Sequence, residues 1–448
     1  MKRHLESKLD HWKKQPSRKP LVLKGLRQCG KTFLLTTWGK KNFPNCHYIN
    51  FEESPLAARI FEGDLSPKNV LRQLSFFLDS SINEESDLVI FDEIQACPRA
   101  LTSLKYFNEQ MPGLALASAG SLLGLSLNDG SFPVGKVEIL SFFPMSFLEF
   151  LLALGDLKSV DAIRECTQQT DIPEVVHQHL WERLKWYFVT GGLPEVVATF
   201  REHQDDLNSA FKKVREKQKQ LLFAYYADFA KHSGKENALH IDRVWRAVPQ
   251  QLALSQNASA SRFQFTGVVP GIDRYQRLAG AIEWLNSTGL ILKTSITSHA
   301  EIPLLAFCKE AIFKLYCCDV GLLGAMIDLP PKAIMHYDYG SYKGYFAENF
   351  VAQELTCRSD EALVCWQQAR AEIEFLRTVD TAIIPLEVKS GTVLRAKSVE
   401  KFAQLYQPPY SVILSGKTIH VDDEKKRHNY PLYLACQFPL RTKGERRR

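Results

Sequence analysis

A glycine-rich segment with one lysine and one threonine stands directly after a short apolar run. Residues 25–32 read Gly-Leu-Arg-Gln-Cys-Gly-Lys-Thr, which is the G-x-x-x-x-G-K-[ST] spacing of a phosphate-binding loop (P-loop). Main-chain N–H groups of such a loop face a polyphosphate, and the following helix N-terminus adds positive field. The expected nucleotide contacts are Gly25, Leu26, Arg27, Gln28, Cys29, Gly30, Lys31, Thr32 and Phe33.

Within this loop, each functional side chain has an expected task. Lys31 is expected to reach the outer phosphates, and the Thr32 hydroxyl is expected to hold Mg²⁺. Cys29 lies at a helix N-terminus beside Lys31, and both features lower the pKa of a thiol. We therefore expect ATP and Mg²⁺ as ligands. For Cys29 two interpretations stay open, an alkylation-sensitive thiol that ATP protects and a small apolar filler.

Two acidic residues complete the chemistry of a phosphoryl-transfer site. Residues 88–93 read Leu-Val-Ile-Phe-Asp-Glu, an apolar strand followed by Asp92 and Glu93. Asp92 is expected to hold the Mg²⁺ shell, and Glu93 is expected to polarise the attacking water. The pattern is weak alone, but it becomes strong about sixty residues after a P-loop. It predicts hydrolysis of ATP to ADP and phosphate.

Further polar residues are candidates for the same site. Ser121 follows an apolar run and is expected at a strand tip, where it would contact the terminal phosphate or the water; Ser118 is second. An ordinary turn serine is the alternative. Lys136 is a candidate cation for a neighbouring subunit's nucleotide, which would make the protein a homo-oligomer, although Arg99 competes and a surface lysine is the plainer interpretation.

A second group of charged residues lies far along the chain. Glu348 lies at the margin of an apolar helical stripe, where an unpaired carboxylate is costly, so it requires a metal or a cation. Glu374 lies in a run of period two, and Glu387 and Lys389 are two residues apart, so a strand would point them to one side. This ordered set resembles the PD-(D/E)xK nucleases. The resemblance implies that Glu374, Glu387 and Glu348 bind Mg²⁺ and that Lys389 activates water, although Glu374 stands where Asp is usual.

The elements that must position these residues follow from hydrophobic periodicity. Strand-like runs recur between helix-length segments, which predicts a parallel sheet covered on both faces. They are residues 21–23, 48–51, 88–91, 114–119 and 137–143. Residues 145–235 have helical spacing, interrupted by Gly191-Gly192-Leu193-Pro194, which marks a helix end.

The middle of the chain offers two candidate nucleic-acid surfaces. Residues 239–300 predict helices followed by strands, similar to a winged-helix unit, in which Arg274, Gln276 and Arg277 could contact duplex DNA. Winged helices also serve as protein-docking modules, so both interpretations stay open. Residues 212–219 carry five basic residues, for which a solvated face and a nucleic-acid groove are the alternatives.

Composition limits the class of protein. The chain has 448 residues, a net charge of +6, and ten cysteines without C-x-x-C spacing. This length predicts two to four domains, and the cysteines fit a reducing cytosol rather than a disulfide framework or a zinc site. Basic residues gather at both termini, as solvated tails or as phosphate contacts. No signal-like or membrane-spanning segment is expected, so a cytoplasmic location is predicted.

Five motifs, in order, carry a family resemblance. They are residues 25–32, Phe-Asp-Glu-Ile-Gln at 91–95, Ser-Phe-Pro-Val-Gly-Lys-Val-Glu at 131–138, Phe-Pro-Met-Ser-Phe-Leu-Glu-Phe-Leu at 143–151, and Gly-Gly-Leu-Pro-Glu-Val-Val at 191–197. Together they resemble a prokaryotic family of AAA+-type ATPases with a C-terminal domain of unknown function, along essentially the whole chain. The resemblance implies a sheet in the order 5-1-4-3-2 and a C-terminal domain of PD-(D/E)xK type.

The expected fold is α/β, with four domains. These are an ATPase core at residues 1–144, a helical lid or linker at 145–235, a winged-helix-like domain at 236–335 and a nuclease-like domain at 336–448. The leading hypothesis is an ATPase coupled to a C-terminal domain that interacts with double-stranded DNA. The alternatives are an ATP-gated, metal-dependent DNA endonuclease and a docking protein that ATP switches without meaningful hydrolysis.

Overall fold

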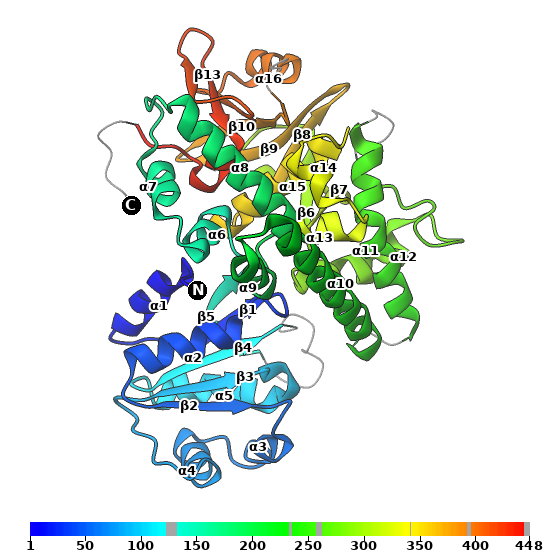
Figure 1. Cartoon of the computed structure of the whole chain (residues 1–448). Helices are drawn as coiled ribbons and strands as arrows, with labels where there is room; N and C mark the ends of the chain where they lie inside the picture. Colours follow the sequence, from blue (N-terminus) through cyan, green and yellow to red (C-terminus); the bar gives the residue numbers. More distant parts are fainter. Residues whose placement is uncertain (122–131, 233–234, 257–261, 341, 392–395, 443–448) are drawn as a thin grey trace. The chain divides into compact units, whose positions relative to one another are not determined.

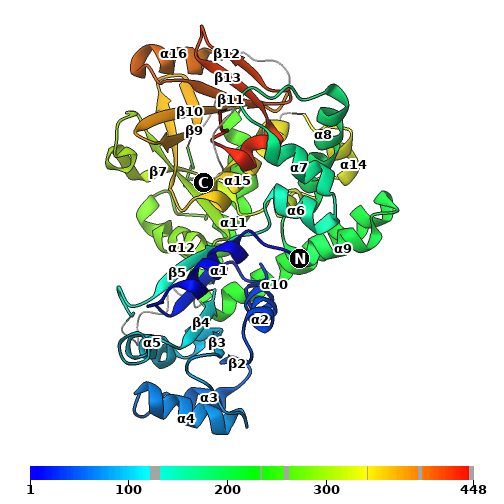
Figure 2. The same ribbon diagram turned by 90° about the vertical axis from the view of Figure 1, so that its left-hand side faces the viewer.

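The computed structural model describes residues 1–121, 132–232, 235–256, 262–340, 342–391 and 396–442 (Figures 1 and 2). It divides into two compact units, which we describe separately. The N-terminal unit comprises residues 2–143 with 287–289, and the C-terminal unit comprises residues 144–286 and 290–448. Most of the basic C-terminal run, residues 443–448, lies outside the described residues.

The N-terminal unit contains a five-stranded sheet in which every pair of neighbouring strands is parallel. Its order is β2-β3-β4-β1-β5, so the implied order 5-1-4-3-2 is confirmed. The strands are β1 (Leu21–Gly25), β2 (Cys46–Asn50), β3 (Leu88–Asp92), β4 (Ala115–Gly120) and β5 (Glu138–Phe142). The helices are α1 (Leu5–Lys14), α2 (Lys31–Asn42), α3 (Pro55–Arg59), α4 (Pro67–Phe77), η1 (Ile94–Ala96) and α5 (Pro98–Gln110).

Helices cover both faces of this sheet, as a buried parallel sheet requires. Val89 and Phe91 of β3 belong to a core shared with α3, α4 and α5. Leu88 and Ile90 point to the other face and lie beside Gly39 of α2. β3 is therefore buried on both faces and apolar from Leu88 to Phe91, which explains the uninterrupted run before Asp92.

The N-terminal basic segment is not a solvated tail between residues 5 and 14. It forms α1, whose Leu5, Leu9 and Trp12 are buried. Asp10 of this helix accepts a hydrogen bond from the indole nitrogen of Trp38 at 2.8 Å. The spacing i, i+4, i+7 of the three apolar residues is the helical signal that the high charge obscured.

The C-terminal unit begins with the expected run of helices and contains one large mixed sheet. The helices are α6 (Phe147–Leu154), α7 (Leu157–Glu165), α8 (Glu174–Thr190), α9 (Pro194–His203), α10 (Leu207–His232), α11 (Lys235–Gln256), α12 (Tyr275–Ser287), η2 (Leu304–Phe307), α13 (Val320–Met326), α14 (Pro331–Met335), α15 (Tyr342–Arg358), α16 (Lys397–Tyr406) and η3 (Leu432–Gln437). The strands are β6 (Ile291–Thr297), β7 (Cys308–Cys317), β8 (Leu363–Gln368), β9 (Ala371–Val379), β10 (Ala382–Val388), β11 (Ser411–Ser415), β12 (His420–Asp422) and β13 (Arg427–Pro431).

Gly191, the first glycine of the pair between α8 and α9, is required by a buried carboxylate. Gly191 has φ of 73° and ψ of −166°, a region that only glycine adopts without strain. A Cβ at Gly191 would lie 2.1 Å from Oδ1 of Asp319. Asp319 accepts a hydrogen bond from the main-chain N–H of Gly192 at 2.6 Å and caps α13 at Leu322. Burial raises the pKa of Asp319 to about 6.

The sheet of the C-terminal unit has the order β12-β13-β11-β10-β9-β8-β6-β7. β6 and β7 form an antiparallel pair, as a wing would, but β6 also pairs with β8 in parallel. The sheet thus includes strands from both sides of the predicted domain boundary at residue 335. The division into four domains stays a prediction. Figures 1 and 2 show α16 beside β9 and β10 at one side of this sheet.

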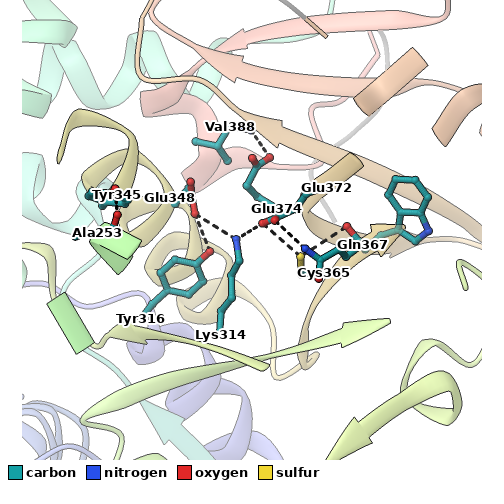
Figure 3. Close-up of polar contacts among 11 residues, drawn as sticks. Ala253, Lys314, Tyr316, Tyr345, Glu348, Cys365, Gln367, Glu372, Glu374 and Val388 are labelled. Carbon is teal, nitrogen blue, oxygen red and sulfur yellow. Dashed lines mark hydrogen bonds and ion pairs between the residues drawn. The ribbon is translucent and has the colours of Figure 1, made fainter. Parts of the chain in front are cut away.

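One face of the sheet is covered by an apolar core, and the other carries charged side chains of β9. Trp366 and Ile373 pack with Phe402 of α16 in an apolar core. Glu372 and Glu374 alternate with Ile373 along β9, and the polar contacts of this part of the sheet reach Glu348 of α15 (Figure 3). Across the described ranges, every helix is too short or too polar to cross a bilayer.

Candidate functional site

The P-loop lies between β1 and α2, as its motif predicts. Gly30 has φ of 91° at the start of α2, in the left-handed region that favours glycine. A Cβ at Gly25 would lie 2.0 Å from the main-chain oxygen of Phe142 on β5. Gly25 is therefore required by the close pairing of β1 and β5, whereas Gly30 is required by the turn into the helix.

Lys31 is buried and folds back over the loop. Its Nζ donates to the main-chain oxygens of Gly25 and Leu26, each at 2.9 Å. Both of these acceptors are main-chain carbonyl groups, so they hold the ammonium at the loop without neutralising its charge. Phe33, the third residue of α2, is 60% exposed and presents its ring to solvent.

Cys29 does not have the environment of a reactive thiol. The residue is fully buried, and its Sγ donates to the main-chain oxygen of Leu26 at 2.8 Å. Burial raises the pKa of the thiol despite the nearby positive charges of Lys31 and Arg3. The expectation of a low pKa is therefore wrong, because desolvation outweighs both charges. Cys29 fills the space beneath the loop.

Arg3 supports the same loop from below and was not expected from the sequence. Its guanidinium donates to the main-chain oxygens of Cys29 at 3.1 Å and Phe143 at 2.7 Å. It also lies over the Phe142 ring, 4.1 Å from the centroid. Because this buried arginine donates hydrogen bonds both to the P-loop and to the residue directly after β5, it fixes the position of the loop relative to β5.

Asp92 is the centre of a hydrogen-bond network at the end of β3. Its Oδ2 accepts from Thr32 Oγ1 at 2.7 Å and from Tyr48 OH at 2.8 Å. Its Oδ1 accepts from the main-chain N–H of Glu93 at 3.0 Å. A hydroxyl and a carboxylate at this spacing are the oxygen ligands that Mg²⁺ prefers, directly or through water. Burial, together with the hydrogen bond to Asp92, raises the pKa of the Tyr48 hydroxyl. Nothing in the sequence indicated this residue, because β2 carries no motif.

Glu93 begins a short 3₁₀ turn in an unusual conformation. Its φ of 47° and ψ of 45° lie in the left-handed region, which is uncommon for glutamate. Gln95 Nε2 donates to Glu93 Oε2 at 2.5 Å, so one oxygen is held and the carboxylate is oriented. Gln95 belongs to the motif at 91–95, but its role becomes visible only through this contact.

The structure distinguishes between the two candidate serines. Ser118 Oγ is fully buried and donates to the main-chain oxygen of Leu21 at 3.0 Å, which is a structural role. Ser121 accepts from Arg27 Nε at 3.3 Å, and Arg27 also contacts Glu52 at 3.0 Å. Residues 122–131, directly after Ser121, lie outside the described residues.

The two candidate cations also differ. Arg99 donates to the main-chain oxygens of Phe61 and Gly63, so it stabilises the end of α3. Lys136 forms an exposed ion pair with Glu109 at 2.9 Å. Its role toward a neighbouring subunit stays a prediction.

The predicted C-terminal charged residues lie in one part of the C-terminal unit, and Figure 3 shows two of them, Glu348 and Glu374. Lys389 Nζ lies 2.5 Å from Glu387 Oε1, which confirms that the side chain of Glu387 on β10 and that of Lys389, directly after β10, point to the same side. Glu374 Oε2 accepts from the main-chain N–H of Val388 at 2.9 Å. Burial raises the pKa of Glu374 well above its ordinary value, and Glu387 and Glu348 raise it further against the effect of Lys389.

Lys314 of β7 joins this group and was not predicted. Its Nζ lies 3.8 Å from Glu348 Oε2 and forms a shorter ion pair with Glu372 Oε1. Tyr316 OH donates to the same Glu348 oxygen at 3.0 Å. Burial alone would lower the pKa of Lys314, but Tyr316, Glu348 and Glu372 raise it well above its ordinary value. Glu348 was expected to need a metal or a cation, and its contact here is an ammonium.

The arrangement of these carboxylates does not match a metal-ligand shell. Among the residues that the structure describes, no group of three or more His, Cys, Asp or Glu side chains has such an arrangement. Oxygens of Glu348, Glu374 and Glu387 already accept from Tyr316, the main chain and Lys389. We therefore derive no reaction step through a metal at this cluster.

The two candidate nucleic-acid surfaces have different outcomes. Arg274, Gln276 and Arg277 are exposed at the beginning of α12. In the basic run at 212–219, Lys212, Lys213 and Lys219 are exposed, and Arg215 and Lys217 are partly buried. Arg215 is largely buried and donates to main-chain oxygens, and Lys217 and Lys219 pair with acids at 2.7 and 2.6 Å. Arg215 is thus anchored in the fold, and for the exposed lysines both alternatives, a solvated face and a nucleic-acid groove, stay open.

Comparisons with known proteins agree with the fold. Residues 17–151 match the model of an AAA domain, and two further models match as domains of unknown function, DUF8612 at 182–333 and DUF4143 at 343–434. No curated protein matches the chain.

Solved structures resemble the chain only distantly. The Walker-type ATPase PABY2304 of Pyrococcus abyssi has 17% identity over 73% of this chain and 95% of its own, with a TM-score of 0.44. The Aeropyrum pernix ORC1 protein in complex with DNA has 14% identity over 74% and 94%, with a TM-score of 0.30. These scores are too low to assign a ligand or a partner. By the family models, the chain carries an AAA domain of the P-loop ATPase class, followed by two domains of unknown function.

Proposed function

We propose that this chain binds ATP with Mg²⁺ and hydrolyses it to ADP and phosphate. The observation that carries the proposal is the direct contact between the P-loop and the acidic strand end, Thr32 Oγ1 to Asp92 Oδ2 at 2.7 Å. The AAA domain match over residues 17–151 supports the same activity.

The chain's own residues divide the work of phosphoryl transfer. N–H groups of residues 28–32 cradle the phosphates, and Lys31, held at the loop by two carbonyls, is placed to meet the outer ones. Mg²⁺, when bound beside Thr32 and Asp92, neutralises charge on the phosphate oxygens. Glu93, oriented through Gln95, polarises the attacking water and accepts its proton. Ser121, bonded to Arg27, is the candidate contact to the terminal phosphate.

Replacement of Glu93 by glutamine tests this assignment. Glu93→Gln keeps the size and one oxygen of the side chain but removes the base, so phosphate release is expected to fall about 10²- to 10⁴-fold. ATP binding, followed with a fluorescent nucleotide, is expected to persist. The matched control is Glu53→Gln, the same change at an exposed position after β2. Equal phosphate release by wild type and Glu93→Gln would instead support the docking protein that ATP switches without hydrolysis.

We also propose that ATP turnover acts on a DNA contact in the C-terminal unit. The exposed side chains of Arg274, Gln276 and Arg277 support this. Each lysine or arginine that contacts phosphate contributes about one unit to the salt slope of binding. The variant Arg274→Gln/Arg277→Gln is therefore expected to flatten the slope for duplex DNA, whereas Lys68→Gln on α4 is the exposed control. Identical slopes would remove this surface from consideration.

The metal-dependent endonuclease is the second candidate. The meeting of Glu348, Glu374 and Glu387 with Lys389 favours it. The ammonium of Lys314 among the same carboxylates opposes it, so we place ATP hydrolysis ahead of DNA cleavage. Plasmid cutting with Mg²⁺ or Mn²⁺ by wild type, lost in Glu387→Ala, would reverse this order.

Light scattering with and without ATP and Mg²⁺ tests the predicted homo-oligomer.

A further inference from the structure

The charged cluster in the C-terminal unit has two cations for four carboxyl groups. The acids are Glu348 on α15, Glu372 and Glu374 on β9, and Glu387 on β10. One cation is Lys389, which belongs to the predicted motif. The other is Lys314 of β7, which lies outside the family match at residues 343–434 and inside the match at 182–333. The second cation thus comes from a different segment of the chain.

Lys314 is held where it reaches two of the acids at once. Its side chain is 6% exposed, and its ammonium pairs with both Glu348 and Glu372 (Figure 3). An ammonium is a compact, strongly hydrated charge, and burial of an unpaired one is costly. The pairing with two carboxylates therefore offsets the cost of burying the charged side chain of Lys314.

We propose that Lys314 is a built-in counter-cation that takes the place of a divalent metal and closes this cluster to metal ions. Mg²⁺ requires oxygens at about 2.0–2.1 Å in octahedral geometry, and Ca²⁺ requires them at about 2.3–2.6 Å. Lys314 Nζ lies 3.8 Å from Glu348 Oε2 and pairs more closely with Glu372 Oε1, so one ammonium occupies the position from which both carboxylates are reached. Because the ammonium is covalently tethered, its effective concentration at the carboxylates is fixed, and it competes there with any metal ion that enters from solution.

A second observation concerns Glu387, whose ion pair is with Lys389. Glu387 is 3% exposed, and its Oε2 accepts no hydrogen bond of ordinary geometry, although the Glu374 carboxyl is close enough to influence its pKa. This oxygen is a ligand atom without a satisfied partner. Removal of the Lys314 charge would leave Glu348 and Glu372 without their shared ammonium, next to the unpartnered Glu387 oxygen, and buried carboxylates without a cation favour the entry of a divalent one.

Titration of the full-length, nucleotide-free chain with Mn²⁺, followed by the electron paramagnetic resonance signal of free Mn²⁺, tests the proposal. Lys314→Met keeps the aliphatic stem and removes the charge, and it is expected to bind one more Mn²⁺ per chain than wild type. The gain is expected to disappear in Lys314→Met/Glu387→Gln. Lys309→Met, an exposed lysine on the same strand, is the matched control and is expected to behave as wild type.

Two results would overturn the proposal. One is a folded Lys314→Met, verified by circular dichroism, that gains no Mn²⁺. The other is a wild-type chain that loses a bound Mn²⁺ on Glu387→Gln, because the cluster would then already accept a metal beside Lys314. The second comparison does not depend on the folding of Lys314→Met. Neither result concerns the ATPase site, so the proposed function is tested separately.

Discussion

Glu354 is a fully buried carboxyl group whose ionisation should destabilise the C-terminal unit. It lies on α15, and its Oε1 accepts the main-chain N–H of Phe147 at the start of α6 at 2.7 Å, whereas its Oε2 is buried without a hydrogen-bond partner. Burial raises its pKa from 4.5 to about 8, and Glu149 adds to the shift while the Phe147 N–H and Arg358 oppose it.

The sign and the size of the pH effect follow from this shift. Between pH 4.5 and 8 the folded state keeps the proton of Glu354 and the unfolded state releases it. The stabilisation is therefore complete below pH 4.5 and is lost as the pH rises through 8. A shift of about 3.5 units at 1.36 kcal/mol per unit sets a ceiling of about 5 kcal/mol.

Glu354→Gln removes the ionisation and keeps the acceptor for Phe147. Its buried amide lacks a second partner, which costs about 1–3 kcal/mol at any pH. Relative to wild type, the variant is expected to be less stable at pH 5 and more stable at pH 9. Urea unfolding of the C-terminal unit across this range measures the difference, and Glu301→Gln at an exposed position of the same unit is the control. A constant difference between Glu354→Gln and wild type from pH 5 to pH 9 would refute the reasoning.

Three further predictions concern single contacts, two within the N-terminal unit and one within the C-terminal unit. Arg3→Gln removes charge-assisted bonds to the P-loop main chain and is expected to weaken nucleotide binding about tenfold in a fluorescence titration; unchanged affinity would contradict this role. Tyr48→Phe removes a donor to Asp92 and is expected to raise the Mg²⁺ concentration for half-maximal ATP turnover about 10- to 100-fold, and an unaltered Mg²⁺ dependence would exclude it. Gly191→Ala places a Cβ against Asp319 and is expected to cost about 2–4 kcal/mol by urea unfolding, whereas a cost below about 0.5 kcal/mol would show that the loop adapts.

The expected chemistry of the N-terminal unit depended mainly on local spacing. The P-loop geometry is a property of consecutive residues, because Gly30 must adopt a positive φ where β1 turns into α2. An apolar strand that ends in two acids likewise places Asp92 at the carboxyl end of β3 in any parallel sheet. The contact between Thr32 and Asp92 follows from the two motifs once the strand order is known.

Contacts from distant segments were not predictable in this way. Arg3 and Tyr48 belong to no motif, and their roles depend on side chains that the fold brings next to the loop and next to Asp92. The environment of Cys29 was predicted with the wrong sign, because sequence shows the neighbouring charges but not the degree of burial that outweighs them.

The sequence by itself determined the motifs whose geometry is local: the phosphate loop, the acidic strand end, and the strand that points Glu387 and Lys389 to one side. Periodicity is enough there, because bond geometry sets which neighbours share a face. Only the tertiary structure decided which cation Glu348 meets, because Lys314 arrives from another strand through sheet pairing. A buried carboxylate specifies that it needs positive charge, but the packing of distant strands decides whether an ammonium or a metal ion supplies it.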